Sequence, residues 1–140
     1  MTRRGAGGAA PHLIWDGSMS DEASENPTRV FIREAIDAGD FGSDGIALDI
    51  NPFFVTLGAT LRGGNPGNVE VGFRMGPETI QGNDVVGGGM IASMLDAATA
   101  TATLSALEPG RTCATITLTV NMIGPGKKSP DFFGPITGLM

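Results

Sequence analysis

The chain has 140 residues, a formal net charge of −6 and a sequence pI of about 4.5. This length fits one domain with a modest apolar core, and the acidic balance argues against nucleic acid as a partner. The single cysteine, Cys113, excludes an intrachain disulfide. No Cys/His spacing typical of a metal site occurs, so we expect neither a metal nor a cofactor.

The sequence also bears on localisation. The basic start at residues 1–4 is not followed by an apolar stretch, so we expect no signal peptide. The apolar run at 85–107 approaches membrane-span length, but it contains Asp96 and several Thr and Ser residues, and basic residues do not flank it. We therefore expect a cytoplasmic protein that does not bind membranes.

Residues 1–26 are rich in Gly, Ala, Ser and acidic side chains and lack apolar periodicity, which predicts a disordered tail. The domain is expected at 27–140. The only histidine, His12, lies in the tail, and a mobile tail is a poor place for a catalytic base.

The first element of the domain is a predicted helix that starts at Thr28 as the N-cap, runs to about Ala38 and stops at Gly39. Its charged side chains, Arg29 among them, are expected on a solvated face.

Shorter elements follow up to residue 75. A short extended piece is expected at 46–48, and a helical turn opens at Asn51-Pro52 and ends at Gly58. Two strands are predicted at 59–62 and 68–75, because apolar and polar residues alternate in the second and a Gly-rich turn separates them.

After a loop at 78–84, a long apolar helix is predicted at 85–107, opened by three consecutive glycines. Asp96 is its only charged residue, and burying an unpaired charge is costly, so this carboxylate must be hydrogen-bonded, neutralised or used. Glycines at a helix N-terminus leave unpaired N–H groups that can hold a developing anion. An anion hole and a carboxylate about two turns apart predict an acyl-transfer site.

The clearest strand pattern in the chain is at 112–123, because apolar side chains there occupy every second position. These positions are Ile116, Leu118, Val120 and Met122. After a loop at 125–130, the last ten residues have room for at most one short strand, around Ile136.

The glycine turn and the carboxylate together resemble a known motif. Residues 85–89 (Val-Val-Gly-Gly-Gly), with Asp96 following, are similar to the helix opening of hotdog-fold acyl-CoA thioesterases of the phenylacetate-degradation (PaaI-like) type, which reads Val-His-Gly-Gly, six residues, Asp. Flanking stretches at 51–58 and 115–125 fit the same family, and the resemblance covers about 50–125. Gly87 departs from the pattern, since it stands where the family usually has His.

The resemblance implies an α+β hotdog fold, an antiparallel sheet wrapped around a long central helix. This fold has five or six strands, so two or three long strands are expected after Gly124, and only about one fits. We therefore expect a hotdog that is incomplete at the C-terminus.

The resemblance also implies an acyl-CoA thioesterase that works as a homodimer or homotetramer. Asp96 takes the place of the carboxylate that acts as general base or nucleophile, and Gly88 that of the backbone oxyanion donor. Gln81 falls where relatives orient the thioester or water, and Thr115 near a hydroxyl that some members supply from the other protomer. The remaining substrate-binding candidates are Gly87, Gly89 and Asn83.

Ordinary structural roles remain open for each residue. Asp96 could be a structural carboxylate bonded to nearby threonines, and the glycines a permissive turn. Lys127 and Lys128 could meet CoA phosphates or lie in a solvated loop. Two other functions also remain open, a non-catalytic acyl-binding or relic hotdog domain and a hotdog dehydratase. The dehydratase ranks last, because that chemistry normally uses a histidine and the predicted domain has none.

Overall fold

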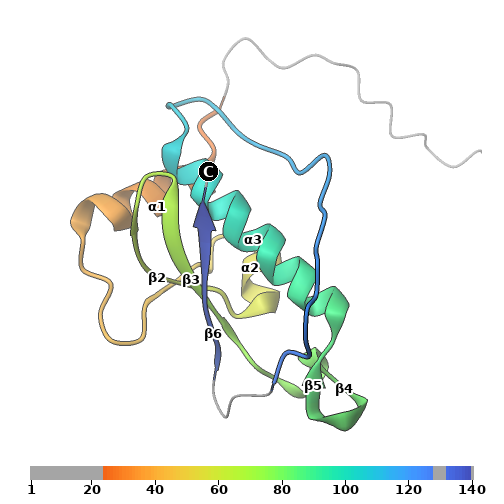
Figure 1. The fold of residues 1–140 in the computed structure, drawn as a ribbon. Helices are drawn as coiled ribbons and strands as arrows, with labels where there is room; N and C mark the ends of the chain where they lie inside the picture. Colours follow the sequence, from red (N-terminus) through yellow and green to blue (C-terminus); the bar gives the residue numbers. More distant parts are fainter. Residues whose placement is uncertain (1–23, 128–131, 140) are drawn as a thin grey trace, which may run out of the picture.

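The computed structural model describes residues 24–127 and 132–139. The protein is α+β, with a long helix, α3 (Gly88–Ala106), packed against an antiparallel sheet of strand order β1-β2-β3-β6 (Figure 1). The strands of this sheet are β1 (Ile46–Ala47), β2 (Thr60–Asn65), β3 (Asn68–Arg74) and β6 (Phe132–Leu139). The other elements are α1 (Pro27–Ala38), α2 (Pro52–Leu57), 3₁₀ turns at Pro77–Thr79 and Gly82–Asp84, and the two-stranded sheet β4 (Ile80–Gln81) and β5 (Val85–Val86).

The N-cap of helix α1 lies two residues earlier than predicted. It is Asn26, whose side-chain oxygen accepts hydrogen bonds from the N–H groups of Thr28 and Arg29 at 2.9 and 3.2 Å. Thr28 is buried inside the helix, so its predicted capping role is wrong. Pro27 at the first helical position explains the difference, because proline lacks an N–H and is favoured there.

Arg29 was predicted to lie on a solvated face, and this prediction is wrong. The residue is only 7% exposed. Its guanidinium pairs with Glu25 and also donates to the carbonyl of Leu107 at 3.3 Å, beyond the end of α3. Glu25 in turn accepts from the N–H of Gly110 at 2.9 Å. Residues 25 and 26 therefore belong to the folded domain and not to the predicted tail. Residues 1–23, including His12, lie outside the described residues.

The hairpin of β2 and β3 confirms the alternation in the sequence. Val69, Val71 and Phe73 are buried, and they face the core together with Leu61 of β2. Pro66 and Gly67 form the turn, with Gly67 at φ 82°, a backbone angle that glycine adopts without strain. The side chains on this face pack against the small residues Ala97, Ala98 and Ala102 of α3, which let helix and sheet approach closely.

The strand predicted at 112–123 is absent from the part of the chain that the structure describes. The segment is extended and runs back along α3 from its C-terminal to its N-terminal end (Figure 1). It makes no backbone ladder with a described strand, and its apolar face is open. Ile116 is 97% exposed, and Leu118, Met122 and Ile123 are also exposed. The pattern of a strand is present, but a neighbouring strand is not. The strand expected around Ile136 is found as β6, which is eight residues long and pairs with β3.

Candidate functional site

The start of α3 is held by backbone hydrogen bonds to segments on both sides of the helix in the sequence. The N–H of Gly87 donates to the carbonyl of Thr79, and that of Val86 to the carbonyl of Gly126, both at 2.9 Å. Gly87 is the N-cap residue, and its own carbonyl accepts from Met90 and Ile91 at 2.9 and 3.0 Å. These contacts fix the direction in which the first turn of the helix points.

The next two N–H groups, those of Gly88 and Gly89, have no acceptor among the described residues, as expected of the first turn of a helix. Gly88 is half-buried and Gly89 is exposed. Both groups can donate to an anionic or carbonyl oxygen, and the positive end of the helix dipole favours negative charge there.

Met122 lies over Gly88. A Cβ atom added to Gly88 would be 3.2 Å from the Met122 sulfur and 3.3 Å from its terminal methyl carbon. Glycine is therefore the residue that fits under this thioether without moving it. This contact of Met122 was not predicted, since the sequence pattern placed its side chain on the apolar face of a strand. Nothing in the strand pattern indicates the contact.

Asp96 and Thr115 are brought together. The Thr115 hydroxyl donates to Oδ1 of Asp96 at 2.6 Å, although 19 residues separate them. The Asp96 side chain is half-buried on α3. The hydroxyl of Thr99 bonds to the backbone carbonyls of Leu95 and Asp96, and not to the carboxylate. The hydroxyl of Thr101 likewise bonds to a backbone carbonyl, that of Ala97, so neither of the nearby helix threonines that could have held the carboxylate bonds to it.

A cavity of about 360 Å³ lies beside this pair, between α3 and residues 113–117. Thr99 and Thr103 line it from the helix, and Cys113, Thr115 and Ile116 from the extended segment. The pKa of the Cys113 thiol is raised by burial and, to a smaller degree, by the charge of Asp96. The Cys113 thiol and the hydroxyl-bearing side chains of four threonines, the three above and Thr117, therefore line a space large enough for a small acyl group, with the Asp96 carboxylate nearby.

Gln81 and Asn83 are placed differently. Gln81 is exposed in β4 and pairs with Val85. Asn83 is exposed in the 3₁₀ turn, at φ 72°. Among the described residues, no hydrogen bond joins either side chain to Asp96 or Thr115. Both residues precede the glycines in the chain and lie near the start of α3, away from the Asp96–Thr115 pair.

The lysines proposed to meet CoA phosphates were Lys127 and Lys128. The backbone of Lys127 forms an isolated bridge with Val85, and its side chain is exposed; Lys128 lies outside the described residues. Within residues 24–127 and 132–139, no group of three His, Cys, Asp or Glu side chains is arranged to hold a metal ion. None of the helices in that same part has the length and hydropathy to cross a membrane.

Comparison with known proteins gave no match to a family model, to a curated protein or to a solved structure.

Proposed function

We propose that the protein is a hotdog-type acyl-CoA thioesterase, with Asp96 as general base or nucleophile and the N–H groups of Gly88 and Gly89 as the oxyanion hole. The observation that carries the proposal is the Thr115–Asp96 hydrogen bond. It fixes a half-buried carboxylate on the helix whose first two N–H groups, those of Gly88 and Gly89, have no acceptor among the described residues. Within that part of the chain the second carboxylate oxygen accepts no hydrogen bond, so water can bind there.

The spacing supports this chemistry. In the proposed reaction, a glycine N–H donates to the thioester carbonyl, and a water bonded to the carboxylate attacks the carbonyl carbon. This arrangement needs roughly 10 Å between the glycine nitrogen and the carboxylate oxygen. The eight residues from Gly88 to Asp96 span about 12 Å of helix. Helical side chains lean towards the N-terminus, which shortens this distance. The developing oxyanion would then lie at the positive end of the helix dipole.

The hotdog architecture is part of the proposal. The long helix packed on an antiparallel sheet is compatible with it, and α3 carries the small residues that such packing needs. In the family that the sequence resembles, the hydroxyl near Thr115 comes from the other protomer. Here, Thr115 reaches Asp96 within one chain.

Self-association is proposed through residues 112–123. Ile116 and Ile123 are fully exposed there, and residues 112–126 contain no charged side chain, so two copies can meet without the repulsion that a net charge of −6 otherwise brings. Ile116→Lys is expected to give a monomer in sedimentation velocity where the wild type is a dimer or tetramer. Thr119→Lys is the control, because Thr119 is an exposed polar residue of the same segment. It adds the same charge as Ile116→Lys without removing an apolar side chain. A monomeric wild type at all concentrations would contradict this proposal.

The activity is tested by thiol release from short, medium and aryl acyl-CoAs. Wild type is compared with Asp96→Asn, which keeps the shape of the side chain but removes its basicity. Glu34→Gln, at an exposed residue of α1, is the matched control. Turnover should vanish in the first variant and persist in the second. Folded wild type without turnover on any substrate would contradict the proposal.

A non-catalytic acyl-binding domain is the second candidate, and the position of Met122 favours it. Its sulfur lies 3.2 Å from the position that a Cβ atom of Gly88 would take, in the same residue whose N–H group a substrate oxygen would have to reach. If this contact prevents reaction, acyl-CoA binds without turnover in wild type, and Met122→Ala gains hydrolysis. If turnover is present in wild type, the thioether moves aside.

A further inference from the structure

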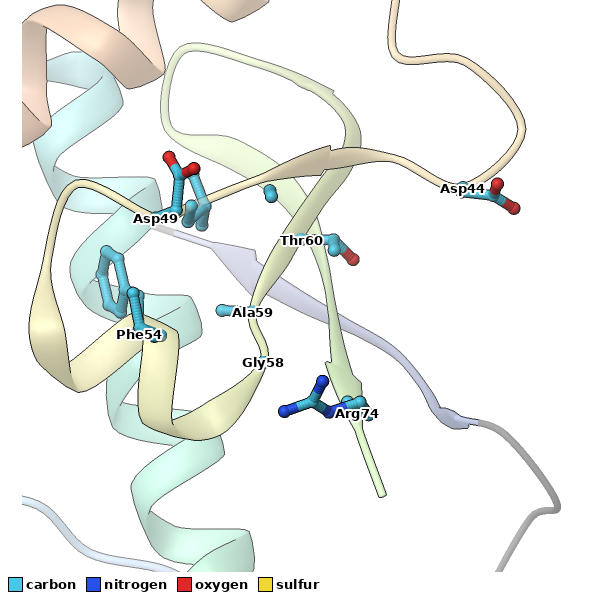
Figure 2. A pocket seen from close by; sticks show the side chains of 10 residues that line it. Asp44, Asp49, Phe54, Gly58, Ala59, Thr60 and Arg74 are labelled. Atoms are coloured by element: carbon cyan, nitrogen blue, oxygen red, sulfur yellow. The ribbon is translucent and has the colours of Figure 1, made fainter. Parts of the chain in front are cut away.

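A second cavity lies away from the candidate site and shares no lining residue with it. It has a volume of about 450 Å³ and lies among β1, α2 and the ends of β2 and β3 (Figure 2). Its apolar lining comes mainly from Leu48, Phe54, Val55 and Ala59, and its charged lining from Asp44, Asp49 and Arg74. The volume is within the range of sites for small organic molecules.

The backbone around this cavity is fixed. Ala59 donates to the carbonyl of Phe54 at 2.9 Å and accepts from the N–H of Leu48 at 3.0 Å. Gly58 accepts from the N–H of Arg74 at 3.3 Å. These bonds tie α2, β3 and the residues after β1 to one short stretch, so the cavity is present before any ligand arrives.

Gly58 also positions the Arg74 side chain. It has φ 57°, and a Cβ atom added to it would be 2.6 Å from the Arg74 Cβ and 3.4 Å from its Nε. Figure 2 shows the guanidinium extending back from β3 towards Gly58. The stem of Arg74 therefore lies across a glycine, and its head is held at the edge of the cavity.

The charged side chains that line the cavity point in different directions. The Arg74 guanidinium makes no ion pair or hydrogen bond with a described residue, whereas Arg29 and Arg33 pair with carboxylates. In Figure 2 the Asp44 carboxylate extends away from the other labelled residues, and that of Asp49 extends away from Arg74. Among the described residues, the Arg74 guanidinium therefore has no partner that an anion would have to displace. The carboxylates of Asp44 and Asp49 also line the cavity, but they point away from Arg74.

We infer that this cavity binds a small monocarboxylate with an apolar body, its carboxylate on Arg74 and its body against Phe54, Leu48 and Val55. The planar guanidinium matches a carboxylate with two parallel hydrogen bonds. Asp44 and Asp49 in the lining disfavour a second negative charge, so the site selects monoanions. This inference goes beyond the proposed function and does not depend on thioester hydrolysis.

The test is titration of the ¹⁵N-labelled protein with hexanoate, followed by amide chemical shifts. The amide signals of Gly58, Ala59 and Thr60 are expected to shift on addition of hexanoate, and the shifts are expected to reach a plateau at high hexanoate concentration. 1-Hexanol, hexylamine and the dicarboxylate adipate, which share the chain length, are expected to bind at least about tenfold more weakly. The alcohol and the amine lack a carboxylate to pair with Arg74, and adipate brings a second negative charge towards Asp44 and Asp49.

Two variants locate the site. Arg74→Gln is expected to weaken hexanoate binding by about tenfold or more, while Arg111→Gln, an exposed arginine outside the cavity, leaves it unchanged. Ala47→Leu fills the cavity from the exposed strand β1 and should abolish binding with Arg74 intact, which decides the matter if Arg74→Gln does not fold. Equal binding of hexanol and hexanoate, an unaffected Ala47→Leu variant, or shifts confined to α3 and residues 113–117 would overturn the inference.

Discussion

The Thr115 hydroxyl and the Asp96 carboxylate form a 2.6 Å hydrogen bond that joins the extended segment after α3 to the middle of that helix. The bond holds one carboxylate oxygen and sets the direction of the other. It also ties residues 112–123, which make no backbone ladder with the described strands, to the folded domain. Thr115 is thus a positioning residue for the proposed base.

Thr115→Val should reduce thioester hydrolysis by about tenfold or more, because it removes a hydrogen bond to a charged group while keeping the side-chain volume. Thr115→Ser should retain most of the activity. Thr117→Val is the matched control, because Thr117 lines the same cavity without bonding to Asp96. Equal rates for the Thr115→Val and Thr117→Val variants would contradict a positioning role.

Ser105 is a buried link between the helix and the hairpin, and Ser105→Ala should lower the free energy of unfolding by about 1–2 kcal/mol. Its hydroxyl donates to the carbonyl of Ala102 at 2.6 Å and accepts from the N–H of Gly67, in the β2–β3 turn, at 2.8 Å. Urea unfolding measures the change. Ser93→Ala is the control, since its hydroxyl bonds only within the helix, to Gly89. It should change stability by less than about 0.5 kcal/mol.

Glu25 gives the protein a specific response to acid. Its pKa lies below the ordinary value of 4.5, chiefly because Arg29 donates to it and also because the Gly110 N–H does. A carboxyl group with a lowered pKa stabilises the fold above its unfolded pKa, and this contribution is lost as the pH falls through the folded value. The melting temperature of wild type should therefore fall more steeply than that of Glu25→Gln as the pH drops below about 5.

Glu34→Gln, at an exposed carboxylate on the same helix, should follow the wild-type curve. Parallel curves for wild type and Glu25→Gln across this range would show that the Glu25–Arg29 pair does not couple to folding.

Cys113 should react slowly with iodoacetamide at pH 8.5, because its pKa is raised by burial and then by the negative charge of Asp96. The thiolate is the reactive form, so a raised pKa lowers the rate. Asp96→Asn removes the second cause and should speed up alkylation, measured by mass spectrometry. Glu108→Gln, an exposed carboxylate beyond α3, is the control and should not change the rate. Slower alkylation in Asp96→Asn would contradict this account.

Much of the fold follows from local signals in the sequence. The alternation through Val69, Val71 and Phe73 predicts a half-buried strand, and the Pro-Gly turn before it limits how the hairpin can close. The glycines at 87–89 mark the start of α3, and Gly39 and Gly58 end α1 and α2 in the left-handed conformation. In each case neighbouring residues determine the structure, so one sequence is enough.

Features that depend on distant residues were missed. Arg29 is buried because Glu25 and the end of α3 come together around it, and a helical pattern alone does not reveal that. The pattern at 112–123 describes which side chains share a face but not whether another strand is present to pair with it. In the candidate site, the bond between Thr115 and Asp96 within one chain was not predicted, because the resemblance implied a hydroxyl from the other protomer. This bond and the contact of Met122 with Gly88 both depend on the path of the segment that follows α3.

Because of that path, amide hydrogen exchange in the segment at 112–123 can show whether another strand pairs with it. Its amide hydrogens have no acceptor among residues 24–127 and 132–139, so in an isolated chain they should exchange with deuterated water almost as fast as those of an unstructured peptide. Any strand that pairs with the segment, from whatever source, would slow the exchange at alternate residues. The pattern of slowed residues would then identify which edge is covered.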